Sequence, residues 1–311
     1  MRAFLFPGQG TQFVGMGVAL ARAFPEAAEV LALADEVLGL PLSRIMAEGP
    51  PARLMETDIT QPAVLAYSLA LLAVLRARGL RPDATAGYSL GEYGALVAAE
   101  VLDPATALGL VRERALAMVQ ARPLSTRSML LVVGPPPEVL AEWCDRCPPG
   151  EVLAIAGFLT PTMHSLSGSE GGLDWLEARV EAGELHAQLR PVPVTLPFHC
   201  SLLAGAQPTL RARLAAADLR PARCPVLFNV DGEPETRPDR CRELLVAQVV
   251  RPVQWVKTVG SLRRLGVDEV WEVGPGRSLG GYLKRIDPAL GRVQVEDAPS
   301  LQALLERLSA G

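Results

Sequence analysis

The segment GYSLGEYGALVA, residues 87–98, constrains the fold of this chain more than any other segment. It places Ser89 between Gly87 and Gly91, the G-x-S-x-G spacing of a serine on a sharp turn between a strand and a helix. Glycines suit such a turn because they do not crowd the neighbouring backbone and they let a substrate approach. The segment therefore predicts a strand–turn–helix unit, in which Ser89 is either a nucleophile or an ordinary corner residue.

Length, charge and hydrophobicity exclude several classes of protein. The chain has 311 residues, 49% of them hydrophobic, which is enough for one large domain or two unequal ones. Its net charge of −4 provides no overall basic field to hold nucleic acid. The first apolar run breaks at Pro7 and Gly8, too early for a signal peptide or membrane span, and no later stretch reaches eighteen apolar residues. We expect a soluble cytoplasmic monomer that binds neither nucleic acid nor membranes.

The cysteines and the glycine-rich loops predict no bound metal and no cofactor. Five cysteines, an odd number, argue against a disulfide framework. Cys144 and Cys147 form a lone C-x-x-C pair, and a zinc site would need a second ligand pair that the sequence does not contain. The glycine-rich segments 7–17 and 274–281 do not have the G-x-G-x-x-G spacing of a dinucleotide site.

Hydrophobic patterning predicts an α/β protein built from two parts. Residues 61–80 form an apolar helix that should be buried, beginning near Pro62 and ending at Gly79. Further elements of the larger part are helices at 105–120 and 298–309 and strands at 2–6, 225–230 and 268–273.

Residues 125–190 show a different order of elements, β-α-β-β-α-β, which is the ferredoxin-like arrangement. We therefore predict a large α/β-hydrolase-like domain, formed by residues 1–124 and 191–311, with a small ferredoxin-like domain inserted at 125–190.

A nucleophilic Ser89 would need a general base within hydrogen-bond reach, and the chain has three histidines. His164 and His186 lie in or beside predicted strands and are expected to be structural or exposed. His199 follows the strand-like run PVPVTLPF, where Pro197 fixes the turn, and loops after strand ends concentrate catalytic groups. We interpret His199 as the base of a Ser–His pair, which permits hydrolysis or acyl transfer.

Arg114 follows on the next predicted helix. A solvated arginine there would have no special role. A buried one would need a carboxylate partner, because a guanidinium pairs with a carboxylate through two parallel hydrogen bonds, and a substrate carboxylate would serve.

Taken together, eight segments resemble the malonyl-CoA:acyl carrier protein transacylases and the free-standing acyltransferases of polyketide assembly lines. The resemblance spans nearly the whole chain. The segments are FPGQGTQFVGMG (6–17), TQPAVLA (60–66), GYSLGEYGALVAA (87–99), LVRERALAM (110–118), LPFHCSLL (196–203), NVDGEP (229–234), QVVRPVQW (248–255) and EVGPGRSLGGYLKRI (272–286).

The resemblance implies a role for each residue that matches a family motif. Ser89 would be the nucleophile and His199 its base, oriented by a main-chain carbonyl near Gln248 instead of an acidic residue. The main-chain N–H groups of Gln9 and Leu90 would form the oxyanion hole. Arg114 would bind the free carboxylate of a malonyl group.

The implied reaction is a ping-pong transfer, in which malonyl-CoA acylates Ser89 and the phosphopantetheine thiol of an acyl carrier protein then takes the acyl group. Acyl-CoA and the carrier protein are thus the expected partners, in fatty acid or polyketide biosynthesis. The alternatives are a transferase of an unusual acyl or aminoacyl group between carrier proteins, and an editing acyl-carrier hydrolase. A non-catalytic docking subunit of the same fold is a further alternative, against which the intact Ser–His pair argues.

The chain departs from the family pattern around the acyl pocket. Tyr88 replaces the usual histidine, IAGFLTP (155–161) stands where the family often has I-A-N-x-N, and STRSML (125–130) replaces a glycine-rich stretch. Phe198 resembles the malonyl-selective form, because its ring leaves little space for an α-methyl branch. Arg114 and Phe198 therefore favour malonyl, whereas Tyr88 and the missing asparagine favour a less usual acyl group.

Overall fold

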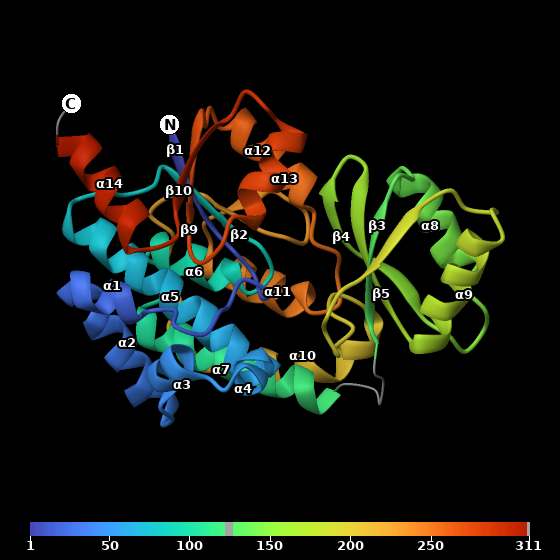
Figure 1. The fold of residues 1–311 in the computed structure, drawn as a ribbon, viewed down its shortest axis with the longest axis horizontal. Coiled ribbons are helices and arrows are strands. Elements are labelled where there is room, and N and C mark those ends of the chain that lie inside the picture. Colours follow the sequence, from blue (N-terminus) through green and yellow to red (C-terminus); the bar gives the residue numbers. More distant parts are fainter. Residues whose placement is uncertain (122–126, 310–311) are drawn as a thin grey trace.

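The structure, a computed structural model, describes residues 1–121 and 127–309. Its main sheet has six strands in the order β10-β9-β1-β2-β7-β8, and all neighbours are parallel except β7 and β8 (Figure 1). The strands are β1 (Arg2–Phe6), β2 (Ala84–Gly87), β7 (Val226–Leu227), β8 (Pro234–Glu235), β9 (Glu269–Val273) and β10 (Gly291–Val295).

Helices cover both faces of this sheet. They are α1 (Val18–Ala23), α2 (Pro25–Leu38), α3 (Leu42–Glu48), α4 (Pro51–Met55), α5 (Thr57–Ala77), α6 (Gly91–Ala98), α7 (Pro104–Ala121), η1 (Ser201–Ala206, a 3-10 helix), α10 (Gln207–Ala216), α11 (Pro238–Gln248), α12 (Trp255–Arg264), α13 (Ser278–Ile286) and α14 (Ala298–Ser309). The helix predicted at 298–309 is confirmed.

The central strand β1 illustrates why this sheet is covered on both sides. Its side chains alternate between two apolar clusters, with Ala3 and Leu5 packing beneath α12 and α13 and Phe4 and Phe6 packing against the cluster that contains α5 and α6. A parallel strand buried on both faces is apolar throughout, which explains the run AFLF at 3–6.

Helix α5 begins earlier than its sequence predicts, at Thr57, so that Pro62 lies inside the helix. Proline cannot donate the backbone hydrogen bond that Asp58 O would otherwise accept. Arg112 Nη1 on α7 donates to Asp58 O instead, and also to Asp58 Oδ2 at 2.7 Å. The expected start at Pro62 was therefore wrong, because a distant side chain supplies the missing donor.

The same helix is long and apolar enough, by length and composition, to cross a membrane. In the structure 89% of its apolar window is buried inside the protein, where it packs against α2 and α7.

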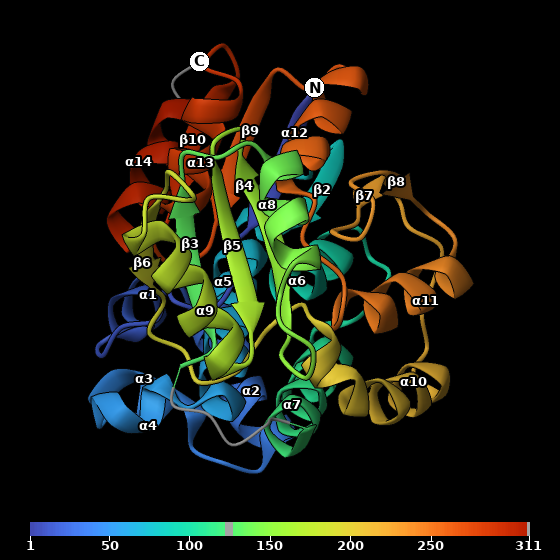
Figure 2. The same ribbon diagram turned by 90° about the vertical axis from the view of Figure 1, so that its right-hand side faces the viewer.

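A second sheet of four antiparallel strands, in the order β4-β5-β3-β6, forms the small unit on the right of Figure 1. Its elements are β3 (Met129–Val133), α8 (Pro137–Asp145), β4 (Leu153–Thr160), β5 (Met163–Gly168), α9 (Glu170–Glu181) and β6 (Gln188–Pro191). Figure 2 shows α8 and α9 covering its outer face. The predicted fold class, hydrolase-like with a ferredoxin-like insertion, is confirmed.

The small sheet contacts the larger part of the protein along β4, which bonds to the segment before α12. Phe158 N–H donates to Val253 O, and Val253 N–H donates to Ala156 O, both at 2.9 Å. The predicted boundary between residues 124 and 125 lies outside the described residues, and the division of the chain at that point stays a prediction.

Candidate active site

Ser89 lies on a tight turn between β2 and α6, with a backbone φ of 53° in the left-handed region. The two flanking glycines are required by close backbone contacts. A Cβ on Gly87 would stand 1.9 Å from Gly91 C, and a Cβ on Gly91 would stand 2.2 Å from Phe6 O. The turn therefore presents the serine side chain at the carboxyl end of β2, as its spacing in the sequence predicts.

His199 contacts Ser89 directly, with 2.8 Å between His199 Nε2 and Ser89 Oγ. Its other ring nitrogen, Nδ1, lies 2.9 Å from the main-chain oxygen of Gln248. Because a carbonyl oxygen can only accept, Nδ1 carries the hydrogen, and Nε2 is left free to accept the proton of the serine hydroxyl. The structure thus brings together Ser89, His199 and Gln248 in the arrangement that a general base needs.

Burial and, to a lesser extent, the nearby positive charge of Arg114 lower the pKa of His199 to about 4, although the Gln248 carbonyl acts in the opposite direction. The side chain is only 4% exposed. The imidazole is therefore neutral at pH 7, which is the form that can accept a proton.

Arg114 is buried beside this pair and is only 1% exposed, so it is not a solvated surface residue. Its Nη2 donates to Ser89 Oγ at 3.1 Å and to Gln248 Oε1 at 2.8 Å, and its Nη1 donates to Gln61 Oε1 at 2.6 Å. Within residues 1–121 and 127–309, Nε has no hydrogen-bond partner and no carboxylate forms an ion pair with the guanidinium. A buried cation without a carboxylate is the environment in which an anionic ligand binds well.

Gln9 lies in the loop after β1, and Leu90 directly follows Ser89 at the start of α6. Leu90 is the N-cap residue of α6, where main-chain N–H groups have no partner inside the helix. Gln9 lines the same cavity as Ser89. In the described part of the chain, neither main-chain N–H donates a hydrogen bond to another protein atom.

A cavity of about 300 Å³ opens beside Ser89 and His199, and both Tyr88 and Phe198 line it. Most of its other lining residues are apolar and come from the small sheet and the loop before His199: Met129, Leu131, Leu159, Val192 and Val194. This apolar lining suits an extended, largely apolar substrate chain whose reactive end lies at Ser89.

Tyr88 lies against Gly157, the first of the two positions where the family often has asparagine, and Leu159 stands at the second position and lines the cavity. A Cβ on Gly157 of β4 would stand 2.8 Å from the Tyr88 hydroxyl oxygen. The ring of Tyr88 packs edge-on against Trp255, with 5.7 Å between centroids, and tilts toward Tyr282 at 6.4 Å. The two departures from the family pattern are therefore one fitted pair, because a side chain at 157 would displace Tyr88.

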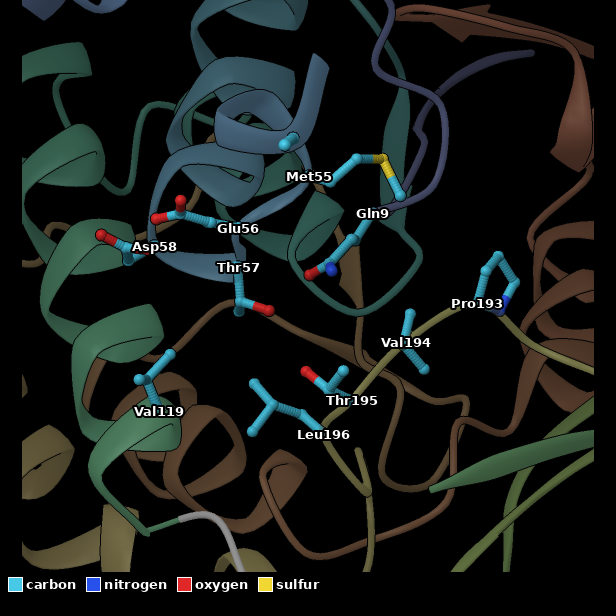
Figure 3. A pocket seen from close by; sticks show the side chains of 11 residues that line it. Gln9, Met55, Glu56, Thr57, Asp58, Val119, Pro193, Val194, Thr195 and Leu196 are labelled. Carbon is cyan, nitrogen blue, oxygen red and sulfur yellow. The ribbon is translucent and has the colours of Figure 1, made fainter. Parts of the chain in front are cut away.

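A second cavity, of about 480 Å³, adjoins the first and shares Gln9 and Val194 with it. Figure 3 shows these two residues together with Thr57 and Thr195, whose side chains point into the cavity. Neither Ser89 nor His199 lines it. The 480 Å³ cavity therefore lies next to the catalytic cavity, with Gln9 between them, and Ser89 and His199 lie in the 300 Å³ cavity.

The other two histidines do not line the catalytic cavity. His164 is buried in β5 with its ring edge-on to Phe158 at 5.7 Å, and burial lowers its pKa. His186 is exposed. Among the described residues, no three His, Cys, Asp or Glu side chains come together as a metal site.

Sequence reasoning missed three polar residues that surround the Ser–His pair: Gln61, Glu92 and Asn229. Each is buried, and each stands next to a run of apolar residues in the sequence. A polar residue beside an apolar run is the signal that could have identified them, because a buried polar group needs a partner.

Known proteins resemble this chain in both sequence and structure. The family model described as "Acyl transferase domain" matches residues 3–278. The malonyl CoA-acyl carrier protein transacylase of Escherichia coli (strain K12) is 37% identical over 305 residues, covering 98% of each chain. An acyl carrier protein S-malonyltransferase structure from Vibrio cholerae is 38% identical with a TM-score of 0.92, covering 97% of this chain and 99% of that one. A malonyl-transacylase solved in complex with its type II PKS acyl-carrier protein is 35% identical with a TM-score of 0.94, covering 98% and 99%.

Proposed function

The chain belongs to the acyl transferase family, and from this membership we propose that it moves a malonyl group from coenzyme A to an acyl carrier protein. The acyl group would be carried as an ester on Ser89, in fatty acid or polyketide biosynthesis. The observation that carries the proposal is a Ser–His pair 2.8 Å apart beside Arg114, a buried cation that has no carboxylate partner in the described chain.

In the first half of the reaction Ser89 Oγ attacks the thioester carbonyl carbon, and its proton passes to His199 Nε2. The Gln248 carbonyl holds Nδ1–H in place as the ring becomes charged. The main-chain N–H groups of Gln9 and Leu90 stabilise the oxyanion, a contribution of roughly 10²–10³ in rate for each donor. The carbon–sulfur bond then breaks, and the coenzyme A sulfur leaves with the proton from Nε2.

In the second half the phosphopantetheine thiol gives its proton to His199 Nε2, and its sulfur attacks the ester carbonyl. The bond between the acyl carbon and Ser89 Oγ breaks, and the serine oxygen regains the proton. The pair therefore returns to its starting state with the acyl group on the carrier protein.

We propose that Arg114 and Phe198 select the acyl group. Malonate carries a carboxylate that can satisfy the guanidinium, and the phenyl ring of Phe198 in the cavity wall limits branching at the α-carbon. The fitted pair of Tyr88 and Gly157 changes another part of the wall, and this favours, as a second candidate, transfer of a different acyl group between carrier proteins.

Replacing Arg114 by alanine separates these two candidates. We expect Arg114→Ala to lower malonyl transfer at least about tenfold, because a charged hydrogen-bonded contact of about 1.5–3 kcal/mol is lost. Acetyl and longer neutral acyl groups should transfer as well as before or better. The measurement is the kcat/KM of wild type and variant for a panel of acyl thioesters.

Arg114→Lys is the matched control, since it keeps the charge but loses the planar fork, and it should fall between wild type and Arg114→Ala with malonyl-CoA. If wild type prefers a neutral or amino-bearing acyl group and Arg114→Ala keeps that preference, the malonyl assignment is wrong and the second candidate replaces it.

We propose that the carrier protein docks on exposed cations near the catalytic cavity. Arg251, Lys284 and Arg285 form no ion pair within the described residues, whereas Arg277 pairs with Glu296. Helix α13, which carries Lys284 and Arg285, also contributes Tyr282 to the cavity. Carrier proteins are acidic, so complementary charge would favour the encounter.

Reversing these charges should weaken the second half-reaction only. We expect Arg251→Glu and Lys284→Glu to raise the KM for the carrier protein several-fold and to leave acylation by malonyl-CoA nearly unchanged. Arg211→Glu, an exposed charge on α10, is the control and should change neither. Equal effects on both half-reactions would show that these residues do not dock the carrier.

We also propose that the protein acts as a cytoplasmic monomer without a bound metal or cofactor. The division into a catalytic part (1–124 and 191–311) and a small domain (125–190) belongs to the same proposal, and the two separate sheets support it.

A further inference from the structure

Glu92 is fully buried in the first turn of α6, three residues after the nucleophile, and it does not touch the catalytic cavity. Its two carboxylate oxygens have different partners. Oε1 accepts from the main-chain N–H of Asn229, and Oε2 accepts from Gln248 Nε2 at 2.5 Å. Burial raises the pKa of Glu92 to about 8, and these two donors and the charge of Arg114 offset part of that rise.

Both partners of Glu92 hold the backbone of the nucleophile. Asn229 Oδ1 accepts from the main-chain N–H of Ser89 at 2.6 Å, and Asn229 Nδ2 donates to Gly87 O at 2.6 Å. Gln248 Nε2 donates to the main-chain oxygen of Ser89 at 2.9 Å. The peptide groups on both sides of Ser89 are therefore held by residues that Glu92 holds, which secures the unusual left-handed φ.

Gln248 also connects Glu92 to the other two functional groups. Its main-chain oxygen contacts His199 Nδ1, and its side-chain Oε1 accepts from Arg114 Nη2 at 2.8 Å. The amide cannot turn over, because its NH₂ would then face the guanidinium and its oxygen would face the carboxylate. The Gln248 amide is thus oriented by the Glu92 carboxyl group on one side and the Arg114 guanidinium on the other.

We propose that Glu92 is a positioning residue of the acyl transfer, acting through Asn229 and Gln248 to hold Ser89, His199 and Arg114 in register. The proposal rests on the proposed function, because it deepens the account of the same site.

Glu92→Gln tests this with almost no change in volume. A glutamine side chain at position 92 has only one oxygen that can accept a hydrogen bond. The N–H donors of Asn229 and Gln248 each need an acceptor there, so one of these two residues must shift. We expect Ser89 to be acylated by malonyl-CoA at least about tenfold more slowly, because the backbone that presents its hydroxyl shifts. The KM should not rise, because the charge of Arg114 is retained. A general loosening of the structure would raise KM as well.

A second readout does not depend on malonyl-CoA. A neutral fluorophosphonate reacts with an activated serine, so its labelling rate at Ser89 should fall at least about tenfold in Glu92→Gln. If the probe labels the wild-type protein but malonyl-CoA does not acylate it, the proposed function is wrong. The labelling rates of wild type and Glu92→Gln would still show whether Glu92 positions Ser89.

The matched control is Glu272→Gln. Glu272 is also a buried carboxylate with two N–H donors, from Leu279 at 3.0 Å and Gly280 at 2.7 Å, but these lie at the start of α13. Glu272→Gln should lower the Tm about as much as Glu92→Gln, but it should change the rate of fluorophosphonate labelling at Ser89 only a little. Labelling of folded Glu92→Gln at the wild-type rate would overturn the proposal. If that variant does not fold, Asn229→Ala tests the same path, and wild-type labelling there would overturn it equally.

Discussion

Ser89→Ala should abolish acylation of the protein by malonyl-CoA. The hydroxyl oxygen is the atom that bonds to the acyl carbon, and alanine offers no atom that could replace it. The fold should persist, because the turn depends on Gly87 and Gly91 and on the hydrogen bonds of Asn229 to the backbone. Intact-mass measurement after incubation should show one added acyl group in wild type and none in the variant.

Ser165→Ala is the control for this experiment. Ser165 is a buried serine that lines the same cavity, and its hydroxyl lies beside the Tyr88 hydroxyl instead of an imidazole. Without a base it should not be acylated, so the variant should still gain one acyl mass. An acyl mass that persists in Ser89→Ala would show that another residue is the nucleophile.

His199→Ala should reduce both half-reactions by roughly 10²–10⁴, since one group moves the proton in each. The pH profile provides a second readout. Because the pKa of His199 is lowered to about 4, wild-type activity should hold from pH 8 to below pH 6 and fall only as the imidazole is protonated near pH 4. The residual activity of His199→Ala should lack that fall.

His164→Ala and His186→Ala are the controls, since neither side chain lines the catalytic cavity. Each, where folded, should keep nearly the wild-type rate in both halves. A loss from either that matches the loss in His199→Ala would show that the base has been misassigned.

Local sequence determined the parts of this protein that depend on neighbouring residues. The turn at Ser89 follows from steric contacts among residues 87–91 and with β1, so the G-x-S-x-G spacing was enough to predict it. The β-α-β-β-α-β order and the helix at 298–309 were likewise readable, because periodicity and turn residues lie within each element. His199 was singled out because it follows a strand-like run, but that expectation was wrong in its detail, since β6 ends at Pro191 and residues 192–198 form an irregular loop.

The tertiary structure alone decided which polar groups meet. Arg114 could be read as solvated or buried, and its partners Gln61 and Gln248 lie 53 and 134 positions away in the chain. The start of α5 depended on Arg112, which is 54 positions from the carbonyl it serves. Glu92, Asn229 and the fit of Tyr88 against Gly157 were invisible for the same reason. A sequence pattern records whether a side chain prefers to be buried, but a hydrogen bond is satisfied by whichever partner the fold brings within reach, and that partner is set by packing across the whole chain.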